Sequence, residues 1–212
     1  EAAGDDYFEN ENYVVSWAVG HLLEFVAPEE IDPKFKRWVL EDLPIIPDEF
    51  QYSPKSGQSE RLKVLKKLYA RNDVTEVITA CDAGREGELI FREILWYFHK
   101  FKNAPQPRQM RRLWLQSMTT DAIKTGFSHL EDGHKFDGLS DAAVCRSEAD
   151  WLIGINATRA LTRRMKTRSE RTAWSAGRVQ TPTLALLVDR EIENLTHRPT
   201  PFWRLQAPFQ AG

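Results

Sequence analysis

The sequence has few cysteines, no long apolar run and no leader-like segment. Cys81 and Cys145 are its only cysteines among 212 residues, and no Cys/His spacing is typical of a metal site. No apolar run approaches the roughly 20 residues needed to span a bilayer. These absences argue against a disulfide-stabilised secreted protein and a membrane protein, and we expect a cytoplasmic location with no membrane partner.

Lysine and arginine are absent from the first thirty positions, which contain eight acidic residues. The balance reverses between residues 159 and 178, where seven Lys or Arg residues face only Glu170, although the net charge of the chain is only -2. A solvated helix end and a phosphate-binding surface explain such a cluster about equally well. Glu1 stands where an initiator Met is expected and no tail pattern follows Pro208, so we expect both ends to be cut.

Apolar periodicity predicts an α/β fold with a parallel-core sheet, flanking helices and a mainly helical second domain, and 42% hydrophobic residues can supply its core. The predicted elements of the first part are a strand at 13–19, an irregular segment at 28–54, a helix at 59–71, a strand at 74–80, a helix after 88, a strand at 112–116 and a helix at 120–130. The second part is predicted to contain a helix at 140–165, a loop at 175–180, a helix from 181 and the start of a strand at 202–209. We expect three domains, at 1–138, 139–198 and 199–212.

Three carboxylates follow the buried strand directly: Asp82, Glu86 and Glu88 fall within seven residues. Open α/β sheets place their ligand sites at the carboxyl ends of strands. Carboxylates 4 Å apart repel by about 4 kcal/mol per pair at an effective dielectric near 20, so a cation is needed to offset them, and Mg²⁺ prefers such oxygen ligands. The alternative is that Asp82 and Glu86 merely cap the following helix. Gly84 and Gly87 have no side chains, so a phosphate could approach the backbone closely at these positions.

The segment DAGREGE, residues 82–88, is similar to the DxDxxGE signature of the Toprim domain. Its extended form CDAGREGELIF closely resembles the topoisomerase III branch of type IA DNA topoisomerases. The resemblance implies that Asp82 and Glu86 act in catalysis and bind Mg²⁺, with Glu88 as a third candidate ligand. Gly84 replaces the second Asp of the signature, which puts a two-ion arrangement in doubt. The family's catalytic Glu in an EKP-type motif matches no residue here.

A second match, RSEADWLIGINATR at residues 146–159, resembles the family's RxxADWLxGxNxTR helix. Arg146, Asp150 and Gly154 lie four apart on one helix face, so Asp150 could orient Arg146 toward a phosphate. Arg159 ends this match and is expected to bind DNA. Read without the family, Arg146 and Asp150 are an ordinary exposed ion pair worth about 0.5 kcal/mol or less.

The third match, SAGRVQTPTL at residues 175–184, resembles the family's element that contacts single-stranded DNA. Gly177 permits close backbone approach, Arg178 can neutralise a phosphate, and Ser175 and Gln180 can donate hydrogen bonds. Early elements, GHLLE at 20–24 and FKRW at 35–38, also resemble the family. Trp38 could stack on a base, although packing is the commoner role for such a Trp. A core role is commoner still for a residue such as His21, and we assign it no function.

The resemblance implies an enzyme, monomeric in full length, that cuts one DNA strand through a 5′-phosphotyrosyl intermediate with Mg²⁺ and passes another strand. No tyrosine in the chain has the context of the family's nucleophile, so we expect the chain alone to be inactive. The alternatives are a non-catalytic single-strand DNA-binding module and another Toprim nuclease or primase, although the latter lack the second and third matches. All these expectations require Asp82 and Glu86 to converge on an ion beside a channel lined by Arg178 and Gln180.

Overall fold

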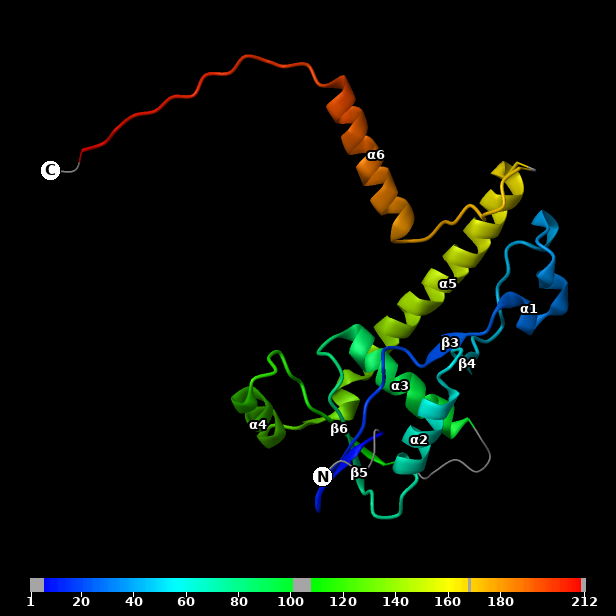
Figure 1. Ribbon diagram of the computed structural model, residues 1–212, viewed down its shortest axis with the longest axis vertical. Helices are drawn as coiled ribbons and strands as arrows, with labels where there is room; N and C mark the ends of the chain where they lie inside the picture. Colours follow the sequence, from blue (N-terminus) through cyan, green and yellow to red (C-terminus); the bar gives the residue numbers. More distant parts are fainter. Residues whose placement is uncertain (1–5, 101–107, 168, 211–212) are drawn as a thin grey trace.

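The computed structural model describes residues 6–100, 108–167 and 169–210 as a mixed α/β structure (Figure 1). Its strands are β1 (Phe8–Glu9), β2 (Val14–Val15), β3 (Leu23–Phe25), β4 (Tyr52–Pro54), β5 (Glu76–Thr79), β6 (Gln109–Arg112) and β7 (Glu131–Asp132). Its helices are α1 (Pro28–Ile31), α2 (Ser59–Tyr69), α3 (Arg85–His99), α4 (Thr120–Ser128), α5 (Asp137–Met165) and α6 (Gln180–Thr196). Three short 3₁₀ turns are η1 (Pro33–Lys36), η2 (Leu40–Asp42) and η3 (Gly133–Phe136). The α/β class predicted from periodicity is confirmed.

A three-stranded sheet in the order β5-β6-β7 positions the acidic turn. Strands β5 and β6 are parallel, with Thr79 opposite Arg112, and β7 is antiparallel to β6. The predicted parallel pair therefore exists, but β6 begins at Gln109 and ends where the predicted strand was to begin. The Leu113 N–H donates to Thr79 O, 2.9 Å away, and this is the final hydrogen bond between the two strands, at the last residue of β5.

Two other predicted strands differ from the structure. Only Val14 and Val15 of the predicted strand at 13–19 pair with a neighbour, the two-residue strand β1. Residues 202–209, all described, form no strand and are fully on the surface, because no neighbouring strand is present to accept their backbone hydrogen bonds. The predicted domain divisions at residues 138 and 198 stay predictions.

The hydrophobic core lies between α2, α3 and the strands. Its buried members are Leu22, Leu23, Leu62, Tyr69, Leu95 and Phe98. Helix α2 repeats its apolar residues at helical spacing, so one face of the helix turns inward. The same packing holds α3 in place, and the first turn of α3 carries the acidic residues.

Helix α5 is 29 residues long, about 44 Å at 1.5 Å per residue, and packs against α3 near its beginning. Figure 1 shows α5 running from the α/β part toward the loop that leads to α6, while α6 and the chain after it extend away from the other elements. Every residue of α6 is exposed. No helix in the described part of the chain has the length and apolar character needed to cross a membrane.

Candidate metal and DNA site

The acidic turn connects the end of β5 to the start of α3. Asp82 lies in the turn and Glu86 in the first turn of the helix, and both are exposed. The residue at the helix N-cap is Gly84, and no side chain caps the helix. Neither Asp82 nor Glu86 caps the helix, which was the alternative considered from the sequence. The helix dipole nevertheless favours the negative charge of Glu86 at this position.

Gly87 allows the acidic turn to lie directly against α3. A Cβ atom at this position would come within 2.2 Å of the Asp82 carbonyl oxygen and 2.7 Å of the Asp82 nitrogen. Gly84 has an extended backbone, and nothing lies within 4 Å of the place where its Cβ would be. Of the two glycines singled out in the sequence, only Gly87 has another group so close that a side chain would not fit. That group is the main chain of the acidic turn itself.

Glu88 does not join the two exposed carboxylates. Its side chain is 1% exposed, and Arg92 Nε donates to Glu88 Oε1 at 2.9 Å. Arg112 Nε lies 3.4 Å from the other oxygen, Oε2. Because both carboxylate oxygens face arginines, Glu88 pairs with two buried cations, and these contacts give no support to its predicted role as a metal ligand.

His21 connects two carboxylates of α3, a role that the sequence did not reveal. Its Nδ1 lies 3.0 Å from Oε2 of the buried Glu93, and its Nε2 lies 3.4 Å from Glu86 Oε2. The hydrogen bond to Glu93 raises the pKa of His21 above its ordinary value of 6.5. Glu86 and Glu93 are seven residues apart and so share a helix face, and this spacing was the available signal for a cation between them.

No three His, Cys, Asp or Glu side chains among residues 6–100, 108–167 and 169–210 converge closely enough to hold a metal ion by themselves. Asp82 and Glu86 still fit the way Mg²⁺ is usually bound, by one or two carboxylates completed by phosphate oxygens and water. The exposure of both carboxylates leaves them accessible to a phosphate from solvent.

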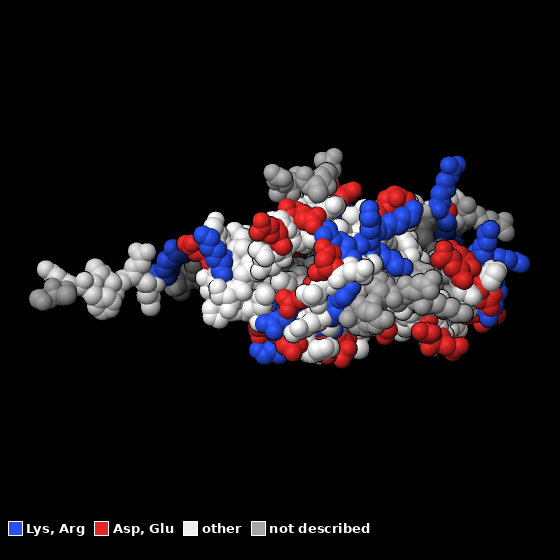
Figure 2. Space-filling model, turned by 90° about the horizontal axis from the view of Figure 1, so that it is seen from below, with Lys and Arg blue, Asp and Glu red and all other residues white. Residues whose placement is uncertain are grey.

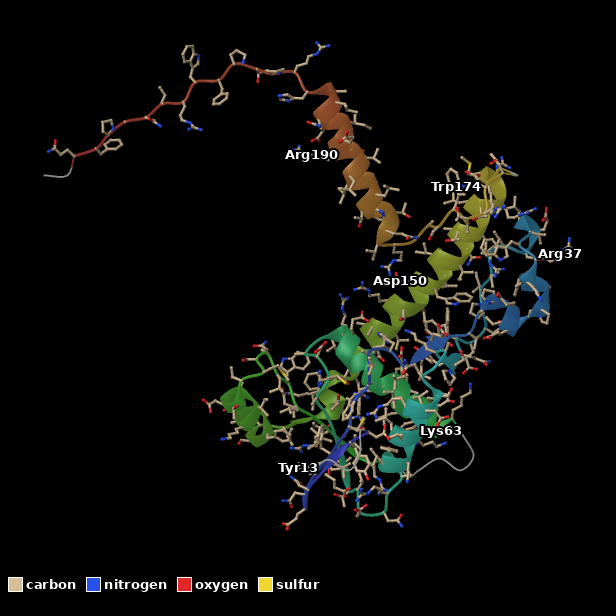
Figure 3. All side chains as sticks on the ribbon, in the orientation of Figure 1. Tyr13, Arg37, Lys63, Asp150, Trp174 and Arg190 are labelled. Atoms are coloured by element: carbon tan, nitrogen blue, oxygen red, sulfur yellow. The ribbon has the colours of Figure 1, made fainter. Side chains whose placement is uncertain are left out.

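One face of α5 holds the loop that precedes α6. The Trp174 N–H donates to Thr162 Oγ1 at 2.9 Å, and the Ala176 N–H donates to Thr158 Oγ1 at 3.0 Å. Figure 3 labels Asp150, which lies on α5, and Trp174, which lies on the loop. Gly154 also lies on α5, with Ala176 O 3.9 Å from the place of its Cβ. The loop is therefore fixed along α5 in an extended course.

Arg178 and Arg146 both approach Asp150. Arg178 Nη1 donates to Asp150 Oδ1 at 3.0 Å, and Arg146 Nε lies 3.7 Å from Oδ2. All three side chains are about two-fifths exposed, so solvent weakens the pairs, but one carboxylate orients two guanidinium groups at the surface. The pair predicted at Arg146 and Asp150 is present, and Arg178 from the loop joins it.

The loop residues predicted to contact DNA are near one another. Gln180 Nε2 donates to Ser175 Oγ at 2.6 Å, and the Gly177 N–H donates to Thr181 Oγ1 at 3.0 Å. Ser175, Arg178 and Gln180 are exposed. Beside the loop, an open groove of about 650 Å³ is lined mainly by apolar residues of α5 and the start of α6. The loop thus presents polar groups to solvent along the edge of an apolar surface.

Arg159 and Trp38 pack against other parts of the protein and do not form an exposed binding surface. Arg159 is 4% exposed, its Nη1 donates to Phe35 O at 2.6 Å, and its Nη2 donates to Glu29 at 3.2 Å. Its guanidinium carbon lies 5.0 Å from the centre of the half-buried Trp38 ring. These contacts attach the segment around α1 and η1 to α5, and they leave the predicted DNA-binding roles of Arg159 and Trp38 without support.

Charges of both signs are mixed on the surface. On the face that Figure 2 displays, Lys and Arg alternate with Asp and Glu, in keeping with a net charge of -2. This face therefore offers no broad basic area for a phosphate backbone. Any contact with nucleic acid depends on local groups such as the loop around Arg178.

Two family comparisons match most of the chain. Residues 3–114 match the Toprim domain, and residues 134–212 match a family described as DNA topoisomerase. The chain is 42% identical over 205 residues to DNA topoisomerase 3 of Bacillus cereus strain ATCC 14579, and 41% identical over 204 residues to that of Bacillus licheniformis. It is 44% identical over 200 residues to DNA topoisomerase 3 of Staphylococcus saprophyticus.

These alignments cover 94–96% of this chain but 26% of each relative, so the chain spans about a quarter of their length. The Toprim match includes the acidic turn, and the second match includes α5 and the loop that it holds. The chain therefore belongs to the type IA DNA topoisomerases of the topoisomerase III kind and contains their Toprim domain.

Proposed function

We propose that the chain supplies the divalent-ion site and part of the single-strand DNA path of an enzyme that cuts and reseals one DNA strand. In that reaction a tyrosine hydroxyl attacks a phosphodiester, the phosphate becomes joined to the tyrosine, and the freed 3′-hydroxyl later attacks the phosphotyrosine to restore the strand. The observation that carries the proposal is that one helix, α5, packs against α3 and also holds the Arg178 loop.

In this proposal Asp82 and Glu86 hold Mg²⁺. The bound ion would supply positive charge that offsets the phosphate charge. Arg178, oriented by Asp150, would neutralise a neighbouring phosphate, while Gln180 and Ser175 would donate hydrogen bonds to the strand. Fixing the strand relative to the ion is the contribution expected of these groups, because alignment alone can lower a reaction barrier substantially.

We also propose that the 212-residue chain binds single-stranded DNA but does not cleave it. The hydroxyl of Tyr52 is buried, and burial raises its pKa, so this group is a poor nucleophile. The hydroxyl of Tyr69 lies 3.1 Å from His99 Nε2 inside the core region. Incubation of the chain with a 3′-labelled oligonucleotide and Mg²⁺ should therefore yield no protein–DNA adduct after denaturation, and a labelled adduct would contradict this proposal.

The ion site can be tested in a chimera in which this chain replaces the matching quarter of Bacillus cereus DNA topoisomerase 3. Asp82→Ala is expected to reduce relaxation of supercoiled DNA at least about 100-fold, because one carboxylate alone holds Mg²⁺ poorly. Asp121→Ala, at an exposed position in α4, is the matched control and should leave relaxation unchanged. Equal activity of the Asp82→Ala and unmodified chimeras would refute the role of Asp82.

A second candidate is a DNA-binding module without metal chemistry. Gly84 in place of the signature carboxylate, and the lack of a three-ligand cluster in the described residues, favour it. An unmodified chimera that binds single-stranded DNA through the Arg178 loop but relaxes no DNA would support this candidate over the first.

A further inference from the structure

Arg112, the last residue of β6, is the most deeply buried charged side chain in the described part of the protein, with 0% exposure. A buried guanidinium is costly unless its donors and its charge are matched. Burial lowers the pKa of Arg112 from its ordinary value, which reflects this cost. The partners of Arg112 therefore show what the fold gains by keeping a cation at this position.

The terminal nitrogens of Arg112 donate to the main chain where β5 continues into the acidic turn. Nη1 donates to Cys81 O at 2.8 Å and to Thr79 O at 3.2 Å, and Nη2 donates to Asp82 O at 2.7 Å. Cys81 and Asp82 lie beyond the end of the strand, so their carbonyl groups have no partner in the sheet. Arg112 supplies that partner and fixes the course of the main chain through Asp82.

The remaining side of the guanidinium faces the helix. Arg112 Nε lies 3.4 Å from Glu88 Oε2 in the first turn of α3. The guanidinium carbon also lies 5.0 Å from the centre of the Trp114 ring, which restricts its orientation. One planar group thus contacts the carbonyl of Asp82 and the helix turn that carries Glu86.

We propose that Arg112 is a positioning residue for the acidic turn, holding the main chain of Asp82 at the separation from α3 at which Asp82 and Glu86 bind one divalent ion. The inference rests on the ion site of the proposed function and adds a residue outside the signature motif. A lysine could not replace Arg112, because a single ammonium lacks the flat array of donors that reaches three carbonyls and a carboxylate together.

The substitution Arg112→Lys tests the positioning role, and Arg92→Lys is its control. Arg92 is also buried against Glu88, but its Nη2 donates to Gly133 O and pairs with Asp137, away from the turn. Both substitutions disturb the same buried carboxylate, so a purely structural role predicts similar effects for both. Mn²⁺ binding to the chain, followed by the electron paramagnetic resonance signal of free Mn²⁺, separates positioning from stability when measured well below each melting temperature.

Arg112→Lys is expected to raise the Mn²⁺ dissociation constant at least about 10-fold, as for other residues that orient metal ligands, and Arg92→Lys less than about twofold. Unchanged Mn²⁺ affinity in Arg112→Lys, or equal weakening by Arg92→Lys, would overturn the inference. If Arg112→Lys does not fold, Trp114→Leu removes the ring that orients Arg112. It is expected to weaken binding about threefold on the same reasoning, and unchanged affinity there would overturn the inference.

Asp82→Asn distinguishes failure of the inference from failure of the proposed function. If this substitution leaves Mn²⁺ affinity unchanged, the ion is not bound at the acidic turn and the proposed site is wrong. If Asp82→Asn weakens binding and Arg112→Lys does not, the site stands and only the role of Arg112 is refuted.

Discussion

Replacing Gly87 with alanine is expected to destabilise the protein, because the added methyl group would overlap the main chain of the acidic turn. The place of the new Cβ is 2.2 Å from Asp82 O and 2.7 Å from Asp82 N. Close C···O contacts in proteins are about 3.3 Å, so the turn would have to move by about 1 Å. Such a movement would also disturb the hydrogen bond from Arg112 to Asp82 O.

The expected magnitude combines two opposing effects. Alanine is favoured over glycine inside a helix by about 1 kcal/mol, whereas overpacking a tight contact costs about 1–3 kcal/mol and more when backbone atoms must move. We expect a net loss of about 2 kcal/mol, which lowers the urea midpoint by about 1 M for a typical urea dependence. Circular dichroism at 222 nm during urea titration measures this midpoint.

Gly84→Ala is the matched control, because its backbone is extended and its Cβ would meet no atom within 4 Å. It should change the free energy of unfolding by less than about 0.5 kcal/mol. A Gly87→Ala protein as stable as the unmodified chain, or a Gly84→Ala protein that loses as much, would refute the reasoning about how the turn packs.

Gly84→Asp adds the carboxylate that the Toprim signature has at this position. We expect this protein to fold and to bind Mn²⁺ roughly 10-fold more tightly, as measured by calorimetry. An unchanged Mn²⁺ affinity would mean that position 84 does not face the ion. In the absence of metal, His21→Gln should change how the free energy of unfolding depends on pH. The pKa of His21 is raised beside Glu93, so protonated His21 stabilises the fold fully below pH 6.5, and this stabilisation is lost as the pH rises through the raised pKa. The melting-temperature difference between the two proteins should shrink over that range, and a constant difference would contradict it. Arg178→Ala should weaken binding to single-stranded oligonucleotides and lower the slope of log affinity against log salt by about 0.7, whereas Arg190→Ala on α6 should do neither. Equal effects of the two substitutions would show only a loss of general charge.

The local parts of the fold were predictable because they depend on neighbouring residues. The strand, acidic turn and helix around Asp82 follow from an apolar β-branched run and helical periodicity, and β5 and α3 confirm them. Strand β6 was displaced because its limits depend on pairing with β5, which no local pattern records. The expected strand at 202–209 failed for the same reason, since apolar alternation does not provide a partner strand.

The site was predictable where its residues share one helix face or one loop. Spacing by four indicated the pairing of Arg146 with Asp150, and the same spacing extended to Thr158 and Thr162 would have revealed the groups that hold the loop. Spacing could not reveal that Arg159 is buried, because its partners lie more than 120 residues away.

Because α5 is one continuous helix, the number of residues between two positions on it fixes the directions in which their side chains point. Each residue of an α-helix advances the chain by about 100° around the axis, so one inserted residue between Arg146 and Asp150 would turn everything beyond it by that angle. The threonines would then face away from the loop, although the acidic turn and the loop sequence itself would be unchanged. Insertions are therefore expected to be tolerated in the surface connections of this chain and not within this helix.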